Sequence, residues 1–78
     1  MMRMLEVRGA ENKDHRRHFI RREHVTEVML DRRQAKADTP GQYIVTVCFL
    51  DGRTESFIFA EENEAAAAKL VEALVEGT

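Results

Sequence analysis

The residues best able to do chemistry are three histidines and one cysteine. His15 and His18 stand three residues apart, His24 follows them, and Cys48 is the only thiol. Imidazoles with a carboxylate or a thiolate can bind zinc, and a thiolate beside an imidazole can act as a nucleophile. Two arginines separate the first two histidines, and their fixed positive charges oppose binding of a dication.

The position of Cys48 favours packing over reactivity. It lies within residues 43–50, a run rich in β-branched and aromatic residues, whereas reactive cysteines usually lie at helix starts or in loops. The four glycines are isolated, so the sequence contains no glycine-rich phosphate loop. The acidic pair Glu61-Glu62 precedes a predicted helix, where the macrodipole favours negative charge. We therefore predict a protein without catalysis, metal or cofactor.

A second group of candidate functional residues consists of three arginine doublets. The planar guanidinium group binds phosphate oxygens through two hydrogen bonds at once, and Phe19 offers a ring on which a base could stack. If the doublets lie along one edge of a sheet, they would bind nucleic acid or another anionic ligand. The predicted anion-binding residues are Arg16, Arg17, Arg21, Arg22, Arg32 and Arg33.

The charge is unevenly distributed along the chain, although the formal net charge is only −2. Residues 1–36 carry ten Lys and Arg against six Asp and Glu, while residues 37–78 carry two against eight. This split is compatible with a polyanionic partner, with a self-complementary oligomer, or with charges that neutralise each other within the fold. The pI of about 5.9 and the absence of Trp make nucleic acid the less favoured partner.

Length and composition indicate one small globular domain, residues 1–78. The chain is 44% hydrophobic and 33% charged, which is typical of a folded soluble protein. A single cysteine excludes an intramolecular disulfide, so no oxidising compartment is needed. No signal peptide is recognised, and no apolar run reaches the roughly 18 residues that a membrane span requires. We expect a cytoplasmic protein without membrane contact.

The elements that position these residues are organised around a β-hairpin at residues 43–60. Two runs of β-branched and aromatic residues flank Asp51-Gly52, the strongest short hairpin signal, because Gly supplies positive φ without steric cost. A two-residue loop would pair Leu50 with Arg53, whereas a bulge at the glycine would shift the register. In either register both faces of the first strand are apolar.

Two further extended segments precede the hairpin, at residues 2–8 and 18–30. A helix over residues 21–30 competes with the second segment, but no good N-cap precedes it and its β-branched residues favour a strand. The predicted loops are residues 10–17 and 31–42, the latter turning at Thr39-Pro40-Gly41.

The C-terminal segment is predicted to be an amphipathic helix over residues 64–76. Asn63 is a suitable N-cap and Gly77 a suitable terminator. Apolar residues recur every three or four positions and form one stripe. The predicted stripe consists of Ala67, Leu70, Val71, Leu74 and Val75.

This order of elements predicts an α+β fold, an antiparallel β-meander of three to four strands with one C-terminal helix packed on the sheet. One helix covers only one face of a sheet, so the N-terminal strands or a second molecule must cover the other. We therefore predict a homo-oligomer built on the sheet, and a further protein partner is compatible with the same surface. The predicted interface residues are Tyr43, Val45, Val47, Phe57 and Phe59.

The same order resembles several small bacterial families, the flagellar FlbD-like proteins among them, and also small pleckstrin-homology-like domains. The matching parts are residues 4–7, 19–28 and 44–52 and the C-terminal helix, nearly the whole chain. The loops at 10–17 and 31–42 are longer and more basic than the pattern. The resemblance implies a small non-catalytic accessory protein and identifies no site residues. The predicted function is protein interaction or assembly, and binding of nucleic acid or another anion is the alternative.

Overall fold

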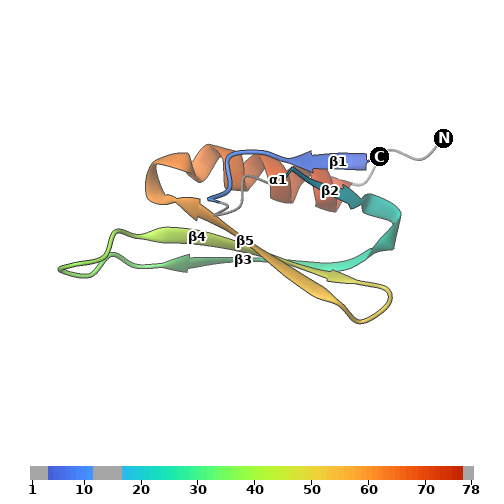
Figure 1. Ribbon diagram of the computed structural model, residues 1–78, viewed down its shortest axis with the longest axis horizontal. Coiled ribbons are helices and arrows are strands. Elements are labelled where there is room, and N and C mark those ends of the chain that lie inside the picture. Colours follow the sequence, from blue (N-terminus) through green and yellow to red (C-terminus); the bar gives the residue numbers. More distant parts are fainter. Residues whose placement is uncertain (1–3, 12–16, 77–78) are drawn as a thin grey trace.

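The computed structural model describes residues 4–11 and 17–76. The elements in this part of the chain are β1 (Met4–Val7), β2 (His18–Arg21), β3 (Val25–Arg33), β4 (Gln42–Phe49), β5 (Thr54–Ala60) and α1 (Glu64–Glu76). Strands β3, β4 and β5 form an antiparallel meander, and β1 and β2 form a separate two-stranded hairpin. This hairpin and α1 lie on the same side of the three-stranded sheet (Figure 1). The predicted α+β arrangement is confirmed.

Residues 18–21 and 25–30 are extended, as predicted, and no α-helix forms over residues 21–30. A short 3-10 turn, Arg22–His24, separates β2 from β3. It coincides with the polar break in the sequence. The pairing of β3 with β4 is interrupted between Val25 and Glu27, so one extra residue bulges there. The break and the bulge redirect the chain from the upper layer into the sheet.

The β4–β5 hairpin does not have the two-residue loop. The Gly52 amide donates to the Phe49 carbonyl at 3.0 Å, and the Phe49 amide donates to the Arg53 carbonyl at 2.9 Å. Gly52 has φ +88°, so the loop contains three residues and ends in a glycine bulge. The register derived from a two-residue loop is therefore wrong by one residue, and Val45 pairs with Phe57.

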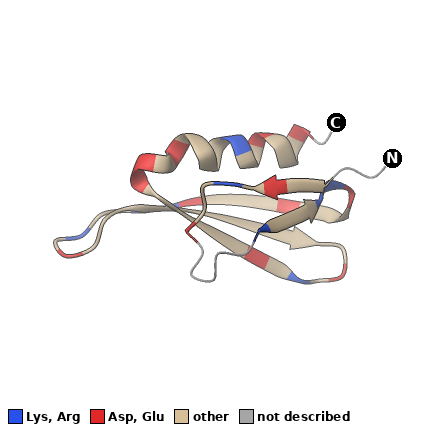
Figure 2. Ribbon diagram, turned by 45° about the horizontal axis from the view of Figure 1, so that its top comes forward, with Lys and Arg blue, Asp and Glu red and all other residues tan. Residues whose placement is uncertain are grey.

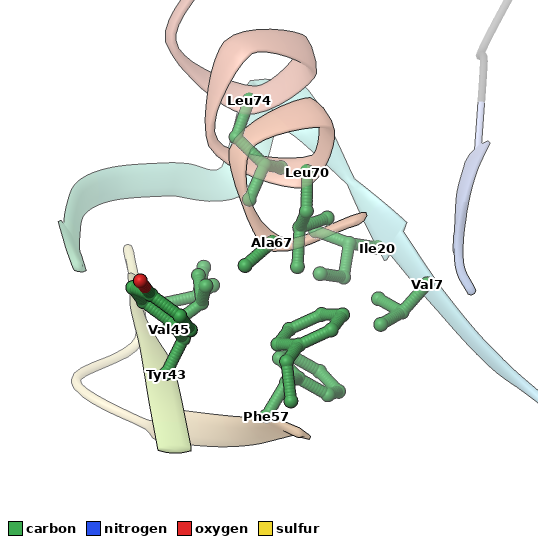
Figure 3. Close-up of a cluster of buried hydrophobic side chains, with 10 residues drawn as sticks. Val7, Ile20, Tyr43, Val45, Phe57, Ala67, Leu70 and Leu74 are labelled. Atoms are coloured by element: carbon green, nitrogen blue, oxygen red, sulfur yellow. The ribbon is translucent and has the colours of Figure 1, made fainter. Parts of the chain in front are cut away.

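This register decides which side chains form the core. Because a shift of one residue turns a whole strand over, the aromatic residues of β5 join the odd-numbered residues of β4 on the covered face. In Figure 3 they meet side chains from α1, β1 and β2. The five predicted interface residues are thus part of the monomer's own core. The core consists of Val7, Ile20, Tyr43, Val45, Val47, Phe57, Phe59, Ala67, Leu70 and Leu74.

The segment between β3 and β4 is shorter than the predicted loop. Strand β3 continues to Arg33, and the tight turn lies at Lys36–Thr39, whose backbones are joined by two hydrogen bonds of 2.8 and 3.2 Å. The predicted turn at residues 39–41 is therefore wrong. The hairpin projects from one end of the molecule, whose principal extents are 46 × 23 × 22 Å (Figure 1).

Helix α1 has the predicted bounds, but its apolar stripe is only partly covered. Three of its residues are buried, whereas Val71 is half-buried and Val75 is 67% exposed. Asn63, the predicted cap, belongs to a 3-10 turn at Glu61–Asn63, and its side-chain nitrogen donates to the Gly9 carbonyl at 3.5 Å. The predicted terminator, Gly77, lies outside the described residues.

Candidate functional site

The thiol and a candidate imidazole lie on opposite faces of the sheet. The His18 ring packs edge-on against Phe57 on the covered face, with 5.5 Å between ring centroids. Cys48 alternates with the buried residues of β4 and is half-buried on the other face. His15 lies outside the described residues. Within residues 4–11 and 17–76, no three His, Cys, Asp or Glu side chains come together as a possible metal site.

Arg17 is held by an acidic neighbour. Its Nε donates to a Glu6 carboxylate oxygen at 2.7 Å, and its guanidinium lies over the Phe19 ring, 5.2 Å from the centroid. The hydrogen bond from Arg17 keeps the pKa of Glu6 below its usual value. Arg16, the other member of this doublet, lies outside the described residues. The Arg17 charge is therefore already partly neutralised.

The other two doublets lie at opposite ends of α1. Arg22 donates to the Ala73 carbonyl at 3.3 Å, in the last turn of the helix, where the macrodipole favours positive charge. Arg32 pairs with Glu61 at 3.4 Å, just before the helix begins. Thirteen helical residues span roughly 20 Å. These two contacts show that the doublets do not form one continuous edge, and Figure 2 shows basic residues at both ends of the molecule.

One small cleft brings two arginines and a histidine together. It has a volume of about 290 Å³, lies between β2 and the end of the β4–β5 hairpin, and is lined by Arg21, His24 and Arg53 among others. Arg53 Nε is paired with an Asp51 carboxylate oxygen at 2.7 Å, and Glu55 also lines the cleft. Arg21 has no recorded ion pair within the described residues. The cleft offers one arginine to an anion.

A groove of about 600 Å³ lies between β1 and α1. Alanine, leucine and glycine make up much of its lining, and Lys69 and Arg8 are its only cationic side chains among the described residues. None of the lining residues is Cys, Ser, Thr, Tyr or His. Among the described residues, the lining of the groove therefore contains no thiol, hydroxyl or imidazole group.

The lower face of the three-stranded sheet is not covered by any described element (Figure 1). The register places Met29 beside Thr46, and Thr46 beside Ser56, with hydroxyl oxygens of the last two 3.3 Å apart. This uncovered face mixes half-exposed apolar and small polar side chains. Its members are Glu27, Met29, Asp31, Arg33, Gln42, Ile44, Thr46, Cys48, Thr54, Ser56, Ile58 and Ala60.

The sheet also has one long free edge, formed by β3. The opposite edge, β5, is contacted by the chain that follows β1, since the Glu11 amide donates to the Ile58 carbonyl at 2.6 Å. Strand β3 is nine residues long, and within the described residues no backbone hydrogen bond joins its outer edge to another segment. Met29 and Leu30 on this strand are 40% and 47% exposed. We take the uncovered face and the β3 edge as the candidate interaction site.

Sequence reasoning anticipated an uncovered face but missed the residues on it. The pattern of β4 alone cannot distinguish its two faces, because both are apolar. The length of β3 was also missed, because residues 31–33 are charged and suggest a loop. A signal for the correct register was present in Gly52, which permits the bulge.

The described residues contain no helix long and apolar enough to cross a membrane. Comparisons with protein-family models, with curated proteins and with solved structures each found no match. The resemblance to small bacterial accessory proteins therefore stays a prediction. Any function must be argued from the uncovered sheet and from the clefts themselves.

Proposed function

We propose that the protein is a small, non-catalytic, cytoplasmic interaction module that assembles with itself through the β3–β4–β5 sheet. The observation that carries the proposal is that α1 and the β1–β2 hairpin lie on the same face of this sheet. Within residues 4–11 and 17–76, no element covers the other face or pairs with the outer edge of β3. The resemblance to bacterial accessory proteins agrees with such a role.

Two general properties of sheets support self-association. Contiguous apolar surface that no part of the chain covers commonly marks an interaction site. An exposed edge strand carries backbone donors and acceptors that can pair with another strand, and natural proteins usually shorten or cover such edges. Here the free edge is the longest strand described, with nine residues. Its length is unusual for an edge that must avoid partners.

Sedimentation velocity of the full chain over a range of concentrations tests this proposal. A small interface formed by a sheet of three strands corresponds to a dissociation constant on the order of micromolar. We expect the sedimentation coefficient to rise from that of a monomer to that of a dimer or larger species over this range. A constant monomer value up to about a hundredfold higher concentration would overturn the proposal.

A second candidate function is binding of an anionic ligand such as nucleic acid at the Arg21 cleft. It is favoured by one observation, namely that Arg21 lines the cleft beside the rings of Phe19 and Phe49 without a recorded ion pair among the described residues. Retention on heparin that falls steeply with salt, and that is weakened by Arg21→Ala, is the expected result. Elution in the void volume at low salt would contradict this function, and Lys36→Ala is the matched control.

A further inference from the structure

We infer that the partner is a second copy of this chain, joined by antiparallel pairing of the two β3 edges about a two-fold axis at Leu30. This inference rests on the proposed function and specifies its geometry. The product is a continuous six-stranded sheet, with the α1 helices of both copies on one side. Antiparallel pairing of identical strands is an isologous contact and closes at two copies.

The β3 edge is a better partner surface than the uncovered face alone. Three strands of about eight residues present roughly 400 Å² per molecule, so a face-to-face contact would bury about 800 Å² in total, the scale of a crystal contact. Several of its residues are hydroxyl-bearing or charged. Edge pairing instead adds backbone hydrogen bonds along β3, and the other edge of the sheet is already contacted by Glu11.

Charge decides where the two-fold axis lies. In an antiparallel pair, residues at equal distances on either side of the axis stand opposite each other on the same face. With the axis at Leu30, Glu27 stands opposite Arg33 of the second copy, and the contact occurs twice. With the axis at Met29, Glu27 would meet Asp31, and with the axis at Asp31, two Asp31 carboxylates would meet. About Leu30, one pair of opposite charges, Glu27 and Arg33, is therefore matched twice, and no like charges within β3 stand opposite each other.

The same register buries apolar surface on the helix side of the sheet. Leu30 pairs with Val45 and so lies on the covered face, yet it is 47% exposed because β3 is at the margin of the layer above. At the axis, the two Leu30 side chains would pack against each other. Helix α1 packs over β3 and carries Val71 and Val75 one turn apart. Val71 is half-buried, and Val75 is 67% exposed. By helix geometry they lie on the side of α1 opposite Ala66 and Lys69, which line the groove beside β1, and so add apolar surface on the side away from β1.

Reversing the charges tests the register. Glu27→Arg places like charges opposite each other at two symmetric positions and should weaken dimerisation about tenfold, as should Arg33→Glu. The double variant Glu27→Arg with Arg33→Glu restores both attractions and should return the dissociation constant close to that of the parent chain. Glu62→Arg, exposed and outside β3, makes the same change in net charge as Glu27→Arg and should have little effect.

The double variant also tests the opposite role for Glu27 and Arg33, in which their charges prevent the β3 edges from pairing. Charged side chains on an edge strand often prevent pairing. If Glu27 and Arg33 serve that role, the two single reversals will leave the dissociation constant unchanged or strengthen association, and the double variant will not differ from them. That result would overturn the inference. Circular dichroism of each variant shows that a change in sedimentation does not reflect loss of the fold.

A cross-link tests the axis directly. In a Cys48→Ser background, Leu30→Cys places two thiols opposite each other, where neighbouring antiparallel Cα atoms are about 4.5–5.5 Å apart, within disulfide range. Mild oxidation should give a covalent dimer. Thr26→Cys in the same background is the control, because its two copies would be roughly 27 Å apart.

Different results would contradict self-association and the Leu30 register. If the parent chain sediments as a dimer but the double reversal does not recover affinity and Leu30→Cys does not cross-link, the Leu30 register is wrong and self-association stands. If the parent chain is a monomer at every concentration, both are wrong. Recovery of affinity together with the cross-link supports both.

Discussion

At the scale of single residues, one polar contact joins the sheet to the start of the helix. The Tyr43 hydroxyl donates to a Glu64 carboxylate oxygen, and Arg32 lies over the Tyr43 ring, 5.8 Å from the centroid. The hydrogen bond to Glu64, followed by burial, raises the pKa of Tyr43 above its ordinary value of 10.0, although the positive charge of Arg32 opposes the rise. The contact fixes α1 over β4.

The chain has a single tyrosine, so phenolate absorbance reports this group alone. We expect Tyr43 to ionise above pH 10.0 and Glu64→Ala to move its pKa back toward that value. Since the neutral phenol is the favoured form in the fold, its contribution to stability is complete below pH 10.0 and is lost as pH rises through the raised pKa. Glu72→Ala is the control. Identical titrations of the parent and of Glu64→Ala would contradict the contact.

Two glycines with positive φ differ in their surroundings. Gly52 has φ +88°, and a Cβ added there would meet no atom within 4 Å, whereas at Gly9, with φ +86°, a Cβ would come 2.8 Å from the Ala66 Cβ on α1. Gly52→Ala should therefore cost only the backbone penalty, about 1–2 kcal/mol. Gly9→Ala adds a clash between layers and should cost more. Denaturant melts measure both, and an equal loss would show that β1 is not seated on the helix.

At the scale of elements, adjacent residues of β5 provide a sharp comparison. Phe57 is 3% exposed on the covered face, and Ile58 is half-buried on the uncovered face. Phe57→Asp buries an unpaired carboxylate at a cost of several kcal/mol, comparable with the stability of a small domain, and should abolish the cooperative melt. Ile58→Asp should keep the fold and most of its stability. If Ile58→Asp unfolds the chain and Phe57→Asp does not, the register of β5 is wrong.

The sequence predicts the strands and the helix well, but it predicts the register of strand pairing less well. The β4–β5 hairpin, the extended runs within residues 18–30 and the bounds of α1 follow from β-branched runs, turn residues and helical periodicity. The register does not, because it depends on the conformation of Gly52, and a slip of one residue exchanged the two faces of β5. The five residues predicted to form an interface share one face in the observed register, and they are in the core because α1 and the β1–β2 hairpin both pack on that face.

The arrangement of the arginines also could not be predicted from local sequence patterns. The doublets are close in sequence, but their positions depend on where the β1–β2 hairpin packs. Because this hairpin joins α1 on the covered face, Arg22 reaches the end of the helix while Arg32 stays at its start. Long-range packing therefore dispersed a cluster that the sequence suggested.

At the scale of the whole molecule, the described elements outside the three-stranded sheet, α1 and the β1–β2 hairpin, all pack on one face of it. A domain of 78 residues is close to the lower limit for independent folding, so burial of further surface by a second copy would add stability through mass action. Pairing at β3 leaves the projecting hairpin of each copy at opposite ends of a longer sheet. The uncovered face would then be six strands wide and available to other partners.

Amide hydrogen exchange at two protein concentrations, one below and one above the dissociation constant, tests self-association at the β3 edge most directly. The outward-facing amides of β3 should exchange more slowly at the higher concentration, while those of β5 and α1 change little, because pairing protects only the joined edge. Exchange of the β3 amides that does not depend on concentration, in a chain that otherwise remains folded, would contradict it.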